Sequence, residues 1–325
     1  MDKNYSVLIA KGIAIIGVVA HHIANRRFPE PERGEIAMLG LILGQPITMF
    51  FCASGYLHAL SRARKPDASF WPFITARARR LLIPFVIIAL VYSVVYTQLV
   101  GTGLLSDALG TSQPWWKKWF ATLTCSPGGV GEQLYFLPLL FLVTVSAAGF
   151  LAVSRNRVEW VFPLACVLIA TAFLTPGFYE LLPGRPILPW HRLAECVGIY
   201  LLGYTMAARP GWVAWLGGTA AALAAGAWAA GRMDAFHCVF WIVLFSAALI
   251  SKVRFRPLEI IGQASGTIYI YHTPFILQPL LVIVATQAPR AWQVPLAFLS
   301  MAGVIVFLTA AHIFLLKGRL KWAAF

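Results

Sequence analysis

Apolar residues occur in runs of about 20 along nearly the whole chain, and short polar stretches separate the runs. A helix needs about 20 apolar residues to cross the hydrocarbon core of a bilayer. The pattern therefore predicts ten transmembrane helices, at residues 5–24, 36–60, 81–100, 133–153, 158–176, 191–207, 212–230, 236–251, 259–285 and 293–316.

The composition supports an all-α integral membrane protein. Of the 325 residues, 59% are hydrophobic and 14% aromatic, and the mean hydropathy of +0.75 exceeds what a soluble globular chain tolerates. No small-residue cleavage site follows the first apolar run, so we expect that run to be retained. Without an internal repeat or a soluble domain, residues 1–325 are expected to form a single membrane domain. The five cysteines are scattered, so neither a disulfide framework nor a metal site is expected.

The charges predict the orientation in the membrane. With the N-terminus inside, 16 of the 26 Lys and Arg and four of the 12 acidic residues fall on the inner side, nine cations and eight acids fall outside, and Lys11 lies within the first span. Basic loops are retained in the cytoplasm, so both termini are expected there, in a multi-pass protein of the cell inner membrane. The net charge of +14 is thereby explained without a nucleic-acid partner.

The longest loop, residues 101–132, contains the stretch TSQPWWKKWF. This stretch is amphipathic and is expected to lie in the outer interface of the membrane. Its tryptophans are interpreted as interface anchors, with stacking against a sugar as the alternative.

Two titratable groups share one face of the first predicted helix. Lys11 and His22 are eleven residues apart, which returns to nearly the same face of a helix after a rise of about 16 Å. His21 points about 80° away from that face. Such groups usually face the interior of a helix bundle. The alternatives are that Lys11 snorkels to the inner interface and that His22 is an interfacial or core histidine.

Two further segments carry weaker signals. In FITARARRLLIPF, Arg77 and Arg80 would present guanidinium groups, which suit phosphates, to one cytoplasmic pocket. Their alternative role is to fix the topology. In FFCASGYLHAL, Ser54 and Gly55 would allow close approach of a neighbouring backbone or of a slender ligand.

Together these motifs resemble the acyltransferase-3 family. The resemblance rests on a basic residue and a histidine in the first span, followed in order by FFCASGYL, RARRLLIPF, QLYFLPLLF and IYIYHTPFI. It covers nearly the whole chain and is strongest over residues 8–90. The family consists of multispanning membrane enzymes that transfer acyl groups, most often acetyl, to sugars of surface and exported glycans. The resemblance thus implies acetyl-CoA as donor, a sugar or glycan acceptor and a location in the lipid bilayer.

Residue by residue, the resemblance places the family's essential histidine at His22 and its RxxR pair at Arg77 and Arg80. It places the basic residue of the first span at Lys11, where the family usually has arginine, so bidentate geometry is lost there. Arg77 and Arg80, with Arg79 and Lys11, would hold the donor phosphates on the inner side. His22 would take the proton of the acceptor hydroxyl or carry the acyl group itself.

Several other residues are candidates for the same site. The oxyanion of the transition state needs a donor, for which the candidates are His21, Ser54, Tyr271 and His272. His272 lies in mid-span, where a histidine is costly, and either contributes to catalysis or forms a wall of the site. Glu195 would orient an imidazole or pair with Arg192, and Glu132 would contact the acceptor or remain in an exposed loop.

Three other functions compete with acyl transfer. A sugar transporter or glycan flippase would have as many spans, but it is expected to show repeated halves and matching interrupted helices. A structural scaffold would not require Lys11 and His22 on one face. A metal-dependent hydrolase is suggested by the adjacent pair His21 and His22, but neighbours on a helix diverge by about 100° and the HExxH spacing is absent.

Overall fold

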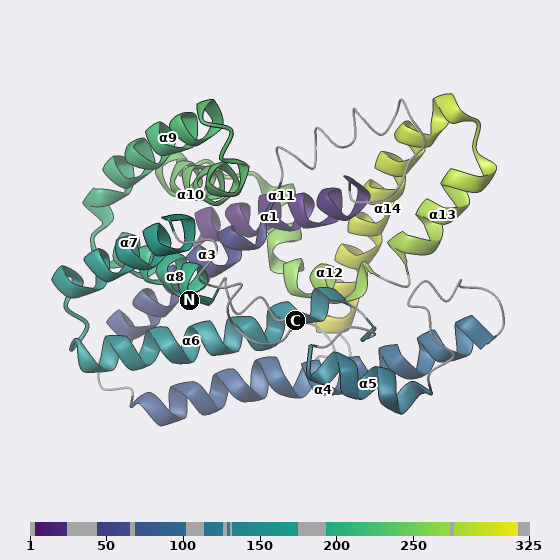
Figure 1. Ribbon diagram of the computed structural model, residues 1–325, viewed down its shortest axis with the longest axis horizontal. Coiled ribbons are helices and arrows are strands. Elements are labelled where there is room, and N and C mark those ends of the chain that lie inside the picture. Colours follow the sequence, from purple (N-terminus) through teal and green to yellow (C-terminus); the bar gives the residue numbers. More distant parts are fainter. Residues whose placement is uncertain are drawn as a thin grey trace. The chain divides into compact units, whose positions relative to one another are not determined.

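The computed structural model describes residues 4–24, 44–65, 69–101, 114–125, 129–130, 132–174, 193–273 and 276–317. All regular structure in these ranges is helical (Figure 1). By length and composition, five helical stretches within the described residues could cross a membrane: Tyr5–Ile23, Phe70–Gly101, Phe136–Val153, Pro210–Ala229 and Arg290–Phe314. Shorter apolar helices cover Val158–Ala170, Leu193–Ala208, Ala235–Ser251 and Leu277–Gln287. The all-α class and the membrane character are confirmed, whereas ten spans and cytoplasmic termini stay predictions.

Most predicted spans coincide with one helix each. These helices are α1 (Tyr5–Ala24), α3 (Ile47–Arg64), α4 (Phe70–Gly101), α6 (Phe136–Val153), α7 (Val158–Leu174), α8 (Leu193–Ala208), α9 (Val213–Ala229), α10 (Met233–Ser251) and α14 (Arg290–Lys317). Short 3-10 turns, η1 (Glu132–Tyr135) and η4 (Pro210–Trp212), precede α6 and α9. The first part of the predicted span 36–60 lies outside the described residues.

The predicted span 259–285 is instead divided among three short helices. They are α11 (Arg256–Gln263), α12 (Ser265–Tyr271) and α13 (Leu277–Gln287). The sequence has Pro274 shortly after the end of α12. Proline cannot donate a backbone hydrogen bond, and it disfavours helical geometry in the residue before it. Pro274 therefore explains why the helix ends after Tyr271, beside a buried histidine, but it does not explain the earlier break between α11 and α12 at Ala264.

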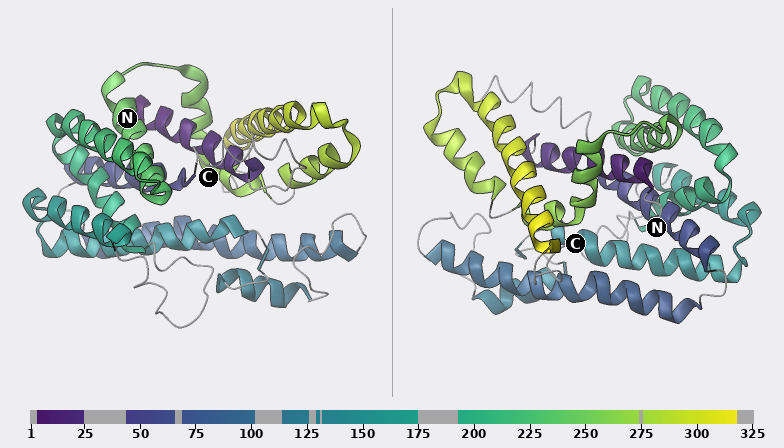
Figure 2. Two further views of the ribbon diagram at one scale, coloured as in Figure 1. Left: turned by 45° about the horizontal axis from the view of Figure 1, so that its top comes forward. Right: turned by 180° about the vertical axis from the view of Figure 1, so that it is seen from behind.

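The chain forms two compact units. Unit 1 comprises Met1–Ala53 and Arg209–Phe325, and unit 2 comprises Ser54–Ala208. In unit 1, α1 packs against α10, α11, α12 and α14, while α9 lies along α10 and α13 returns along α14 (Figures 1 and 2). The backbones of α1 and α11 cross closely, because a Cβ at Gly12 would overlap the Leu258 carbonyl group and one at Gly262 would overlap the Leu8 carbonyl group. Small residues permit such close approach between membrane helices.

In unit 2, α4 runs beside α6 and α5 (Trp115–Leu123), and α8 packs against α6 and α7. A Cβ at Gly55 would overlap the Tyr200 carbonyl oxygen, so α3 approaches the backbone of α8 directly. For Gly55 this confirms one of the two alternatives, the close approach of a neighbouring backbone, whereas the role of Ser54 stays a prediction.

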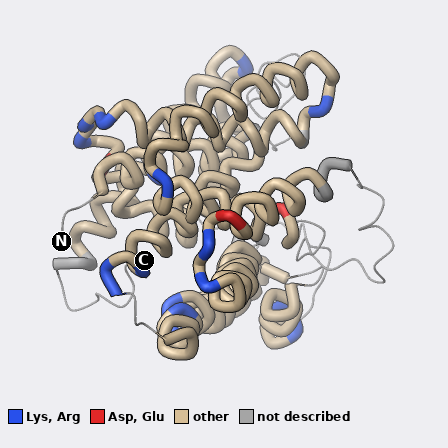
Figure 3. The backbone as a smooth tube through the Cα atoms, turned by 90° about the vertical axis from the view of Figure 1, so that its left-hand side faces the viewer, with Lys and Arg blue, Asp and Glu red and all other residues tan. Residues whose placement is uncertain are grey.

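Lysine and arginine lie mainly at helix ends and turns, and the central turns of most helices carry no charge (Figure 3). Helix α4 has 32 residues, about 48 Å, and so exceeds the roughly 30 Å of a hydrocarbon core. If residues 81–100 span the core as predicted, the turns that carry Arg77, Arg79 and Arg80 extend beyond it.

The amphipathic stretch in the long loop forms helix α5. Trp115, Trp116 and Phe120 are exposed, whereas Lys118 is 1% exposed, with its ammonium group 5.0 Å from the centre of the Tyr96 ring. Exposed aromatic rings on one face are consistent with the predicted role as interface anchors.

Candidate functional site

Helix α1 carries three of the predicted site residues. His21 and His22 lie in its last turn and Lys11 in its first half, and all three side chains are half-buried. The helix is continuous from Tyr5 to Ala24, so Lys11 and His22 are separated by a rise of about 16 Å, as the sequence predicted.

Close to His22 lies His272, which comes from a segment 250 residues later in the chain. The two ring centroids are 5.0 Å apart and the rings are tilted by 57°. His21 lies farther away, with its ring 6.2 Å from that of His22, and Tyr269 lies 6.2 Å from His272. The structure therefore brings together three of the predicted histidines, all of them in unit 1.

The end of α12 holds His272 in place. Its side chain is 0% exposed, and its Nδ1 lies 2.9 Å from both the Ile268 and the Tyr269 carbonyl oxygens. The backbone N–H of His272 also bonds to the Ile268 carbonyl oxygen, at 3.0 Å. These bonds fix both the position and the rotation of the ring. Tyr271, another candidate oxyanion donor, is half-buried at the end of the same helix.

A second polar cluster in unit 1 involves a histidine to which the sequence gave no functional role. His312 of α14 is buried, and its Nδ1 lies 2.8 Å from the Thr267 hydroxyl of α12. Lys11 is near enough to act electrostatically on His312. The sequence offered no signal for this cluster, because the register of α14 against α1 is a tertiary property.

In unit 2, the first turns of α4 are joined to α3 and α8 by a stack of side chains. The Arg77 guanidinium carbon lies 5.3 Å from the centre of the Phe73 ring. That ring stacks on His58, at 4.3 Å with an interplanar angle of 13°. His58 Nδ1 lies 3.0 Å from the Tyr200 hydroxyl, which is also within hydrogen-bond reach of Thr144. Arg77 is half-buried as a result, whereas Arg79 and Arg80 are exposed.

A cavity of about 260 Å³ adjoins this stack. It is formed by the C-terminal ends of α3 and α6 and by the start of α4, and its lining is His58, Arg62, Ser69, Phe70, Phe73, Ala148, Leu151, Ala152 and Asn156. Asn156 accepts a hydrogen bond of 3.3 Å from the Tyr204 hydroxyl, which ties the turn after α6 to α8. Small-molecule pockets commonly have about 300–1,000 Å³, so this cavity suits a phosphate-bearing fragment rather than a whole coenzyme.

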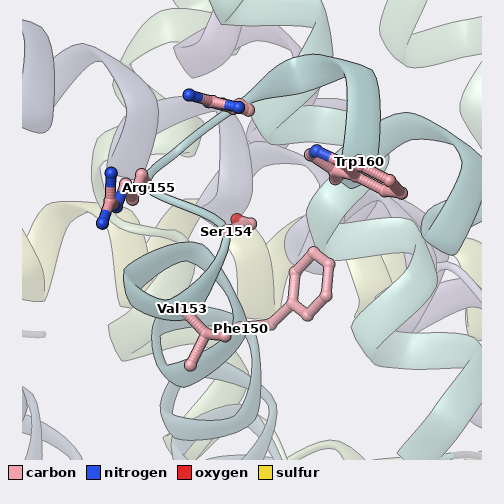
Figure 4. Close-up of a pocket in the computed structure, with 6 residues that line it drawn as sticks. Phe150, Val153, Ser154, Arg155 and Trp160 are labelled. Carbon is pink, nitrogen blue, oxygen red and sulfur yellow. The ribbon is translucent and has the colours of Figure 1, made fainter.

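A second, more open cavity of about 370 Å³ lies at the turn between α6 and α7. Its lining includes Phe150, Ser154, Arg155, Arg157 and Trp160, and Arg155 lies on the opposite side from Trp160 (Figure 4). Its two arginines are exposed. The smaller cavity is more enclosed and is the better candidate for binding an anionic group.

The remaining predicted residues lie in unit 2. Ser54 is half-buried on α3, and Glu195 is 7% exposed near the start of α8. Arg192, one expected partner of Glu195, and the side chain of Glu132 lie outside the described residues. Because Glu195 and the histidines belong to different units, the role of Glu195 in orienting an imidazole stays a prediction.

Comparison with known families identifies the chain. The family described as acyltransferase domain matches residues 4–313, which is nearly the whole chain. The matched residues include His22 and His272. Comparisons with curated proteins and with solved structures give no match. The chain belongs to the acyltransferase-3 family.

Proposed function

We propose that the protein is a membrane-bound O-acyltransferase. It takes an acyl group, acetyl by preference, from cytoplasmic acyl-CoA and transfers it to a sugar hydroxyl of an exported or surface glycan. It works in the cell inner membrane. The observation that carries the proposal is the pair of imidazoles, His22 and His272, 5.0 Å apart inside a chain of an acyltransferase family.

The basic end of unit 2 is the proposed donor site. Arg62 lines the enclosed cavity, and Arg77 packs on a ring that forms part of its wall. Guanidinium groups bind phosphates well, and the coenzyme is a phosphorylated nucleotide. The arginines Arg79 and Arg80 add positive charge at the same helix end. The excess of basic residues here is the basis for assigning this end to the cytoplasm, where acyl-CoA is available.

The histidine pair is the proposed reaction site. A neutral imidazole accepts a proton near neutral pH and is also a nucleophile toward a thioester. His22 can therefore either take the proton of the acceptor hydroxyl or carry the acyl group between donor and acceptor. The charge on Lys11 lies about 16 Å along the same helix, a separation that a long, thin donor arm could span.

A sugar transporter or flippase is the alternative. The break between α11 and α13 favours it, since interrupted helices often form transport sites. A transporter would not turn over acetyl-CoA. Release of free thiol from acetyl-CoA by the purified protein therefore separates the two functions.

The direct test compares surface glycans from cells with and without the protein by mass spectrometry. Acetyl esters that depend on the protein, and that disappear in His22→Ala at normal expression, are the expected result. Full activity of His22→Ala would overturn the role of His22. A protein that neither consumes acetyl-CoA nor changes any glycan would overturn the proposed function.

A further inference from the structure

The hydrogen bonds of His272 determine which of its ring nitrogens carries the hydrogen. Both partners of Nδ1 are backbone carbonyl oxygens, which only accept hydrogen bonds. Nδ1 is therefore the N–H. A doubly protonated ring would place a second N–H, and a positive charge, in a fully buried position with no acceptor among the described residues, at a cost of several kcal/mol. The resting ring is therefore neutral, with the lone pair on Nε2.

This lone pair is buried and lacks a donor. His272 Nε2 has no hydrogen-bond partner among the residues that the structure describes. Buried polar atoms are usually paired, and an unpaired one in a native structure calls for an explanation, such as a catalytic role or a bound water. The centre of the His22 ring lies 5.0 Å from that of His272, and no hydroxyl donor to His272 Nε2 is present in the described part of the chain. A ligand hydroxyl would complete the site.

The two carbonyl oxygens also prepare the ring to accept a proton. When Nε2 takes a proton, the positive charge spreads over the ring, and the Nδ1–H that faces two carbonyl dipoles becomes a stronger donor. Acceptors on the far nitrogen stabilise an imidazolium in this way in catalytic triads, and they also hold the ring in the productive tautomer. His272 thus has the tautomer, the orientation and the stabilising partners of a general base.

We propose that His272 Nε2 binds and deprotonates the acceptor hydroxyl, while His22 carries the acyl group. This rests on the proposed function. First, a His22 nitrogen attacks the thioester carbon, the C–N bond forms and the C–S bond breaks. The coenzyme leaves as its thiol with the proton that His22 releases. Next, the acceptor oxygen attacks the acyl carbon, the C–O bond forms and the C–N bond breaks. Its proton passes to His272 Nε2 and then to His22, so both rings end neutral.

The Nδ1–H tautomer also bears on the oxyanion of the transition state. His272 was among the candidate donors to the oxyanion. The Nδ1–H of the resting ring already bonds to two carbonyl oxygens, and Nε2 carries only a lone pair. The ring therefore has no hydrogen that it could donate to the oxyanion of the transition state. Another group must therefore donate the hydrogen bond to the oxyanion.

The experiment separates the two half-reactions. Exchange of label between acetyl-CoA and free CoA, catalysed by purified protein, requires only the acyl–His22 step. Acetyl esters on the surface glycans of cells that carry each variant require both steps. His272→Asn keeps an amide donor near the position of Nδ1, and His272→Gln places an amide near Nε2, but neither provides a base. We expect both variants to exchange label within about threefold of the wild type and to lose about 100-fold or more of glycan acetylation.

Two further variants serve as controls for the His272 variants. His22→Ala should lose both reactions. His237→Asn, at a buried histidine of α10 that packs against Gly44, should keep both. Near-normal glycan acetylation in the His272 variants, or loss of exchange in both of them, would overturn the assignment of His272. A wild type that acetylates glycan without exchange would overturn the acyl–His22 intermediate. A wild type that does neither would overturn the proposed function itself.

Discussion

The hydrogen bond between Tyr200 and His58 allows the stability of a variant of unit 2 to be predicted. Tyr200 is 0% exposed and His58 is 3% exposed, and the phenol oxygen lies 3.0 Å from His58 Nδ1. Tyr200→Phe removes only the hydroxyl. Thr144 keeps its bond to the Leu140 carbonyl oxygen, at 2.7 Å, so the one group that loses its observed partner is the His58 ring nitrogen.

The size of the effect follows from this burial. Leaving a buried polar atom unpaired costs about 1–3 kcal/mol in soluble proteins, whereas hydrogen bonds between membrane helices average about 0.6 kcal/mol. Since both groups are almost fully buried, we expect the upper part of the membrane range. The predicted loss in the free energy of unfolding is about 1 kcal/mol, or about fivefold in the unfolding equilibrium constant.

The assay is reversible unfolding of the purified protein in mixed micelles of a mild detergent and sodium dodecyl sulfate. A double-mutant cycle with His58→Phe, which keeps a ring against Phe73, isolates the contact. Tyr204→Phe is the matched control, because its hydroxyl makes a longer, partly buried bond of 3.3 Å and should matter less. Strictly additive effects of Tyr200→Phe and His58→Phe would refute the reasoning.

Three further predictions concern packing, donor binding and thiol chemistry. Gly262→Ala should destabilise the protein by about 1–3 kcal/mol, because the added Cβ meets a backbone carbonyl, while Gly226→Ala, with open space around it, should not. Arg62→Gln should weaken acetyl-CoA binding several-fold in a binding assay, more than Arg64→Gln on the same helix end. Burial raises the pKa of Cys125 to about 11, so in a variant with only this cysteine, maleimide labelling should be slow at neutral pH and should rise about tenfold per pH unit up to that value.

Each of these has a clear contrary result. Equal stability of the two glycine variants would mean that α1 and α11 are not in backbone contact. Equal donor affinity in the two arginine variants would remove the enclosed cavity from the donor site. Labelling of Cys125 that levels off near pH 8.5, as for an ordinary exposed thiol, would show that the loop after α5 does not bury it.

The sequence predicted the helices well because their length and apolarity are local properties. The run from Tyr5 to Ala24 gave α1 with both ends correct. The run at 259–285 is interrupted by polar residues such as Glu259, Gln263 and His272, and its division into three helices also reflects the packing of α12 against α1 and α14, which hydropathy does not encode. Counting apolar runs therefore treats three short helices as one span.

The candidate site was predictable only in part for a similar reason. His22 followed from its position on α1 and from the family motif, and His272 followed from its mid-span position. That their rings lie side by side is a tertiary fact. The tautomer of His272 depends on two carbonyl oxygens at the end of a seven-residue helix. The cluster of Lys11, Thr267 and His312, and the place of His58 in a cavity wall, likewise became visible only in the structure.

The close crossing of α1 and α11 limits how this protein can move. Sliding α1 by one helical turn, about 5.4 Å, would drive other side chains into the carbonyl groups of Leu258 and Leu8 that now face glycines. A piston-like stroke of α1 along α11 is thus sterically blocked, so His22 keeps its height relative to α11. A substrate therefore has to reach the His22 imidazole at this height, because the ring cannot move along the axis of α1 to meet it.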